Sequence, residues 1–129
     1  LGSNESFDKQ SGEKYFANLD QMIQGIKEKN PQACVLVMTS PPSVLHRKYK
    51  NTFIEKYAEI IEDNAHVKNY AVWNLLDVFG GNTSIKRNAA KGYMARDKVH
   101  YSKAGYEKQG ELFFEAFLQS YELFKSTKQ

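Results

Sequence analysis

Residues 33–38 read Ala-Cys-Val-Leu-Val-Met, an unbroken apolar run that ends in the polar loop Thr39–Ser43. Continuous runs rich in valine are typical of parallel strands covered on both faces, although a run this short is also compatible with a helix. Cys34 lies inside the run, so we expect it to be a buried small apolar side chain. Because open α/β sheets bind ligands at the carboxyl ends of their strands, the loop is a predicted part of a site.

Amphipathic segments lie on both sides of this strand. Apolar side chains recur at helical spacing before it, after it and again at the end of the chain. Helices are predicted at residues 12–29 (after the N-cap Ser11), 49–64, 84–90 and from Ser102 to about Lys125, and a second strand at 70–75. The alternation of helices and strands predicts a single α/β domain with a parallel sheet.

The composition narrows the class of protein. Of the 129 residues, 41% are hydrophobic and 13% aromatic, which suits one globular domain. The net charge of +3 is too small to predict nucleic-acid binding, and no stretch is long enough for a membrane span. The single cysteine permits no disulfide within the chain, and no metal-ligand spacing or phosphate-binding loop occurs. The sequence therefore predicts no cofactor and no metal, and it leaves the oligomeric state open.

Asp97 precedes His100 by three residues, and Ser102 then begins the final helix. In a tight turn this spacing lets the Asp97 carboxylate reach Nδ1 of His100, which fixes the tautomer and leaves Nε2 able to accept a proton from a hydroxyl. The alternative is that Asp97 only helps to start a helix and His100 is a surface residue. His46 lies in a basic loop that could border a cleft or simply face solvent, and His66 lies at a polar helix end.

Other side chains are weaker candidates. Asp77 follows the second predicted strand and is a rival acid to Asp97. Ser40, Ser84 and Ser102 are the hydroxyls nearest to predicted loops, but none lies in the strand-to-helix elbow that a serine nucleophile needs. We therefore assign none of them as the nucleophile.

The residues Gly2-Ser3-Asn4-Glu5, together with Asp97-x-x-His100, resemble two sequence blocks of the SGNH (GDSL-like) hydrolases. Gly2 to Asn4 look like the third block, whose asparagine helps to form the oxyanion hole, and Asp97 with His100 looks like the last block, which supplies two members of the triad. Residues 35–42 and 80–92 look like the segments between these blocks. Glu5 replaces the aspartate of many members, and the chain contains no Gly-Asp-Ser motif and no second-block glycine.

The resemblance implies a three-layer α/β/α, flavodoxin-like fold and the hydrolysis of an ester. Within the family we favour a carbohydrate O-acetyl ester, for example in an acetylated polysaccharide, and the family also favours a secreted or periplasmic location. Asp97 and His100 would be catalytic, Asn4 would donate to the oxyanion, and Gly2, Ser40 and His46 are possible cleft residues.

The resemblance also places residues 1–129 in the C-terminal portion of a single domain. Leu1 would then end a strand whose body lies upstream, and the serine would come from outside this chain. An upstream segment or a partner chain would complete the sheet, and we expect the chain alone to be inactive.

Two other classes remain open. A non-catalytic SGNH-like module that binds carbohydrate or a partner would explain the absent serine motif, and a flavodoxin-like regulatory domain would make the resemblance a coincidence. Between Ser84 and Lys103 six basic residues accompany the single acid Asp97. This stretch is either a solvated loop or a positive rim that attracts an anionic substrate.

Overall fold

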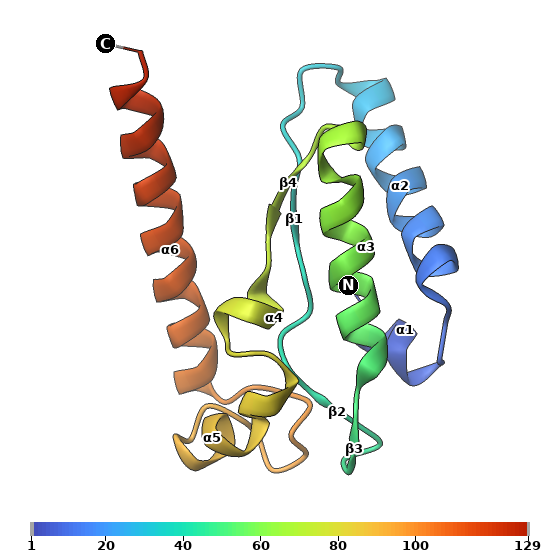
Figure 1. The fold of residues 1–129 in the computed structure, drawn as a ribbon, viewed down its shortest axis with the longest axis vertical. Helices are drawn as coiled ribbons and strands as arrows, with labels where there is room; N and C mark the ends of the chain where they lie inside the picture. Colours follow the sequence, from blue (N-terminus) through green and yellow to red (C-terminus); the bar gives the residue numbers. More distant parts are fainter. Residues whose placement is uncertain (1, 129) are drawn as a thin grey trace.

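The structure, a computed structural model, describes residues 2–128, so the strand end predicted at Leu1 lies outside the described residues. The α-helices are α1 (Ser3–Phe7), α2 (Gly12–Lys29), α3 (Thr52–Lys68), α4 (Leu75–Val78), α5 (Ile85–Ala90) and α6 (Lys103–Ser126), with a 3-10 turn η1 (Asn82–Ser84). The strands are β1 (Leu36–Met38), β2 (Val44–Leu45), β3 (Tyr49–Lys50) and β4 (Ala71–Trp73). Figure 1 shows β1 and β4 in the middle, with α2 and α3 on one side and α6 on the other.

β1 and β4 pair in parallel, with Val37 opposite Val72. Backbone bonds lengthen the ladder at both ends, because the Ala71 N–H donates to the Val35 carbonyl at 2.9 Å and the Thr39 N–H donates to the Trp73 carbonyl at 3.2 Å. The layers and the parallel pair confirm the predicted α/β fold with helices on both sides of a parallel sheet.

Two predicted boundaries are wrong. The strand predicted at 70–75 ends at Trp73, because the side-chain oxygen of Asn74 accepts the Asp77 N–H at 3.1 Å and thereby caps α4. The helix predicted at 49–64 spans Thr52–Lys68 instead. Its expected first residues pair as β3 with β2, in a short antiparallel ladder.

The face of the sheet toward α2 and α3 is closely packed. Val37 joins a buried cluster with side chains from both helices and from the residue before β4: Tyr15, Leu19, Ile23, Tyr57, Ile61 and Tyr70. The rings of Tyr15 and Tyr57 stack with centroids 4.1 Å apart. Burying each large side chain of this kind contributes about 1.5–3 kcal/mol, so this layer supplies much of the folding free energy.

The opposite face is only partly covered. Phe113 of α6 packs edge-on against Trp73 with ring centroids 5.0 Å apart, but Leu36 and Met38 on the same face are 47% and 44% exposed. Cys34 is exposed as well. The expectation of a strand covered on both faces with Cys34 buried is therefore wrong for the described residues, because α6 packs against β4 and leaves the β1 side of this face open.

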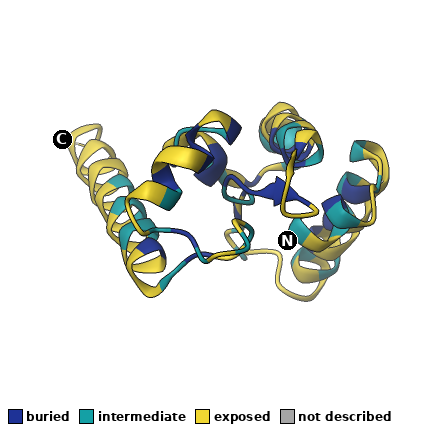
Figure 2. Ribbon diagram, turned by 90° about the horizontal axis from the view of Figure 1, so that it is seen from below, coloured by how far each residue is buried: buried dark blue, intermediate teal, exposed yellow. Residues whose placement is uncertain are grey.

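The final helix is as long as predicted, but its apolar stripe is not buried along its whole length. Figure 2 shows the outer part of α6 as exposed, apart from the rest of the fold. Phe117, Tyr121 and Phe124 are 59%, 51% and 53% exposed. Among residues 2–128, no helix has the length and apolar character needed to cross a membrane.

Candidate active site

Asp97 and His100 form a hydrogen-bonded pair in the loop before α6, with Oδ2 of Asp97 2.7 Å from Nδ1 of His100. The other carboxylate oxygen accepts the backbone N–H groups of Val99 at 2.9 Å and His100 at 3.0 Å. The bond to the His100 side chain, followed by these two backbone donors, lowers the pKa of the Asp97 carboxyl below its ordinary value. The contact expected from the three-residue spacing is thus present, with an ionised carboxylate at neutral pH.

This contact orients the imidazole ring. A carboxylate at Nδ1 favours the tautomer that carries its proton there, so Nε2 can accept a proton from a ligand. The His100 side chain is 72% exposed and that of Asp97 is 26% exposed. The outer edge of the ring is therefore accessible, while the carboxylate behind it is partly shielded.

The backbone holds the loop in this shape. The Lys98 N–H donates to the Ala95 carbonyl at 3.0 Å, and Lys98 itself adopts a left-handed conformation with φ of 55°. The Ala95 N–H in turn donates to the His100 carbonyl at 2.9 Å. Ser102 then caps α6, as predicted, by accepting the Gly105 N–H at 3.1 Å. The backbone of His100 is therefore held by the turn on one side and by the capped start of α6 on the other.

Asn4 lies on the short helix α1, and the turn before it requires a glycine. Gly2 has φ of 105° and ψ of −33°, and its N–H donates to the Glu5 carboxylate at 2.8 Å. A Cβ atom on Gly2 would lie 2.6 Å from the Ser40 hydroxyl oxygen. The glycine thus permits both the turn and the close approach of α1 to the loop after β1. Glu5 caps the turn, so the change from aspartate leaves a carboxylate in a structural contact.

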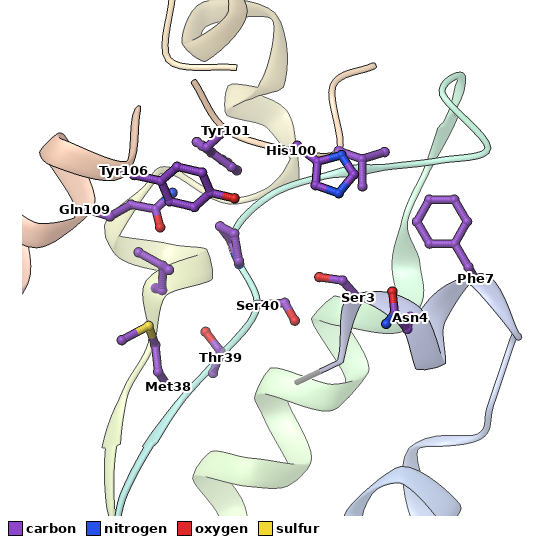
Figure 3. Close-up of a pocket in the computed structure, with 13 residues that line it drawn as sticks. Ser3, Asn4, Phe7, Met38, Thr39, Ser40, His100, Tyr101, Tyr106 and Gln109 are labelled. Atoms are coloured by element: carbon purple, nitrogen blue, oxygen red, sulfur yellow. The ribbon is translucent and has the colours of Figure 1, made fainter. Parts of the chain in front are cut away.

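Residues from the start of the chain and from the loop before α6 line one cavity of about 470 Å³. Its lining includes Asn4 from α1, Ser40 from the loop after β1, and His100. Figure 3 shows Ser3, Asn4, Ser40 and His100 around the same space. Residues that are 96 positions apart in sequence therefore border one cavity at the carboxyl end of the parallel strands, where such sheets bind ligands.

Several predicted candidates do not line this cavity. Gly2 is not part of the lining, although it lies against Ser40, which is. His46 is exposed and meets the cavity only indirectly, because its ring packs edge-on against Phe7 with centroids 5.5 Å apart. Asp77, the rival acid, is exposed, is bonded to Asn74 and does not line the cavity.

The remaining polar candidates also lie elsewhere. His66 is exposed in the last turn of α3. The hydroxyls of Ser84 and Ser102 donate to the carbonyls of Gly81 at 2.7 Å and Gly92 at 2.6 Å, and neither serine lines the cavity. No group of three or more potential metal ligands occurs within residues 2–128.

Sequence reasoning missed part of the lining. Tyr106 and Gln109 of α6 border the cavity, together with Tyr101, whose hydroxyl donates to the Pro42 carbonyl at 2.7 Å. The signal for Tyr106 and Gln109 was their three-residue spacing just after the Ser102 cap, which places both on one face of the first turns of α6. Whether this face of α6 borders a cavity depends on how α6 is tilted against the sheet, and the sequence does not determine that tilt.

The chain has an α/β fold of the SGNH-hydrolase type. The chain belongs to the GDSL-like lipase/acylhydrolase family, which matches residues 1–108. The predicted family is thereby confirmed.

A solved structure described as "Peptidoglycan O-acetylesterase in action, 5 min" has the same fold, with a TM-score of 0.81 and 20% sequence identity. The similarity covers 92% of this chain and 35% of that protein, so this chain spans about a third of its length. No curated protein matches the chain.

Proposed function

We propose that this chain supplies the histidine, the aspartate and an oxyanion donor of a serine ester hydrolase. The observation that carries the proposal is that Asn4 and His100, whose ring is bonded to Asp97 at 2.7 Å, border the same cavity. An upstream segment of the same protein, or a partner chain, provides the serine. Residues 1–129 alone are then inactive.

In this mechanism the serine hydroxyl attacks the ester carbonyl while Nε2 of His100 takes its proton. His100 then gives the proton to the leaving alcohol, and water hydrolyses the acyl-enzyme by the same steps. Asp97 orients the ring and stabilises the imidazolium. The side-chain NH₂ of Asn4 donates to the oxyanion, and one such donor typically lowers the barrier by roughly 3 kcal/mol.

The substrate that we propose is an O-acetyl ester of a carbohydrate. The structurally similar enzyme is a peptidoglycan O-acetylesterase, and Tyr106 offers an exposed aromatic ring at the cavity on which a sugar could pack. The basic residues around Asp97, including Lys98 and Lys103, would favour a polymer that carries negative charge.

The test is the hydrolysis of acetylated xylan, acetylated peptidoglycan and simple esters by the protein that includes the upstream segment. We expect His100→Ala to lower kcat by about 10⁴- to 10⁶-fold and Asp97→Asn by about 10³- to 10⁴-fold, because the base and its orienting group are lost. His66→Ala is the matched control, since it removes an exposed histidine outside the cavity and should leave kcat unchanged. Equal and small effects in all three variants would contradict the assignment.

A non-catalytic carbohydrate-binding module is the second candidate, and the absence of a Gly-Asp-Ser motif from the 129 residues favours it. This function predicts saturable binding of the polysaccharide with no release of acetate from the complete protein. Isothermal titration beside an acetate-release assay distinguishes the two, because only the esterase consumes its ligand.

A further inference from the structure

Asn51 directly precedes α3, where an asparagine side chain commonly caps the helix, yet it makes no capping bond. Its side chain is fully buried, and Nδ2 donates instead to the Ser6 hydroxyl at 2.9 Å and to the Ser43 hydroxyl at 3.4 Å. The amide thus points away from its own helix and toward two other segments of the site.

Ser6 connects this amide to the helix that carries Asn4. The Ser6 hydroxyl is fully buried and donates to the Ser3 carbonyl at 2.6 Å. Because the Ser6 hydroxyl proton is donated to Ser3, its oxygen can only accept a hydrogen bond from Asn51. The side-chain group of Asn51 that faces Ser6 must therefore be the NH₂ and not the carbonyl oxygen. α1 has only five residues and is too short to be stable by itself, so such bonds determine where it lies.

The other end of the connection is the segment 42–44, which is fixed to the histidine loop by two bonds. The Pro42 carbonyl accepts the Tyr101 hydroxyl at 2.7 Å, and the Val44 N–H donates to the Lys98 carbonyl at 3.1 Å. Lys98 belongs to the Asp97–His100 turn, and Tyr101 follows it directly. A chain of buried and partly buried hydrogen bonds therefore runs from α1 through Asn51 to the loop that holds His100.

We propose that Asn51 is a positioning residue, whose amide holds the Asn4 side chain in a fixed place relative to His100. The inference rests on the proposed esterase function. An oxyanion donor must be placed to within about 0.5 Å, and a displacement of about 1 Å can reduce the rate about 10²-fold. Asn51 acts through Asn4 and does not touch the substrate, because it does not line the cavity.

The test measures kcat and KM of the complete protein with Asn51→Ala and with Ser6→Ala, which break the same link from its two sides. We expect each variant to lower kcat about 10- to 100-fold with little change in KM. Combined with Asn4→Ala, neither should lower kcat much further, because the donor that they position is already gone. Ser6→Ala removes a single oxygen atom and keeps the test informative if Asn51→Ala fails to fold.

Asn88 is the matched control for loss of buried hydrogen bonds. It is 5% exposed, and its Nδ2 donates to the Phe79 carbonyl at 3.1 Å and the Ser84 hydroxyl at 2.9 Å, away from the cavity. Asn88→Ala should lower the melting temperature without lowering kcat.

The possible results separate the two proposals. Full activity in both Asn51→Ala and Ser6→Ala, beside a loss in Asn4→Ala, would overturn the positioning role alone. An equal fold-loss from Asn51→Ala with and without Asn4 would also overturn it, because the damage would then be general. Full activity in Asn4→Ala would overturn the oxyanion assignment and the positioning role with it.

Discussion

Asp97 shows how one carboxylate organises the site at the scale of a single residue. Its two oxygens accept three hydrogen bonds from its own turn, one from the His100 ring and two from backbone N–H groups. Protonation of Asp97 would weaken all three bonds, so the shape of the turn and the orientation of the imidazole both depend on its charge. This dependence gives the turn a pH response.

We expect Asp97 to make the stability of the fold depend on pH in acid. The pKa of Asp97 is lower in the folded state than in the unfolded state. Asp97 therefore stabilises the fold fully at pH values above the ordinary aspartate pKa. As the pH falls below that pKa, the unfolded state binds a proton first and this stabilisation is lost. Between about pH 5 and pH 2, urea unfolding should show a steeper loss of stability in the wild type than in Asp97→Asn. Parallel pH profiles would contradict this. Other acids with lowered pKa values, such as Asp20, are common to both proteins and cancel in the comparison.

The Asp97–His100 contact could be predicted because it is local. A separation of three residues leaves few conformations in a tight turn, and most of them bring the two side chains together. The places of Tyr106 and Gln109 could not be predicted in the same way, since they depend on how α6 leans against the sheet. The assignment of Asn4 came from the family resemblance rather than from its surroundings in the sequence.

At the scale of elements, α1 shows how a helix of five residues can be held in place by its neighbours. It begins at a glycine with positive φ, and the Glu5 carboxylate accepts the N–H of that glycine at 2.8 Å. Ser6 then bonds to Asn51 at 2.9 Å. The helix is therefore positioned by contacts at both ends, and a disturbance at either end should move Asn4.

We expect Gly2→Ala to destabilise the protein by about 1–3 kcal/mol, because a side chain is strained at this φ and its Cβ would meet the Ser40 hydroxyl at 2.6 Å. The control is Gly110→Ala in α6, where nothing lies within 4 Å of the added Cβ and alanine should stabilise the helix by about 0.5–1 kcal/mol. Thermal unfolding measures both effects. A Gly2→Ala protein as stable as the wild type would mean that α1 can shift without cost.

The predictability of the elements follows their length. α2 was predicted correctly, because eighteen residues repeat an apolar face and Ser11 caps the first turn. β3 lies inside a segment that was predicted as helix, since two residues give no period and only the pairing with β2 determines them. The strand predicted at 70–75 is shorter than expected, because the Asn74 side chain caps α4 although apolar residues continue past it.

At the scale of the whole molecule, the outer edge of β1 is unpaired among the described residues. Among the described residues β1 pairs with β4 alone. The Val35 carbonyl and the Thr39 N–H face β4, so in a parallel ladder the backbone groups of Leu36 and Met38 face the other way. The side chains of Leu36 and Met38 are also about half exposed, and Leu36 lines one pocket with Phe113 and Phe117 of α6. An open edge next to apolar surface favours pairing with another strand.

We therefore expect an upstream segment of the same protein, or a partner chain, to add a strand along β1. Hydrogen exchange tests this at the backbone N–H groups of Leu36 and Met38, which should exchange slowly in the complete protein and fast in residues 1–129 expressed alone. The Thr39 N–H, bonded to the Trp73 carbonyl, is the internal reference that should be protected in any folded form. Equal, fast exchange at Leu36 and Met38 in both proteins would mean that the edge stays open. If residues 1–129 fold cooperatively as a monomer, the chain is a complete folding unit, and ester hydrolysis by that monomer would place the nucleophile within these residues.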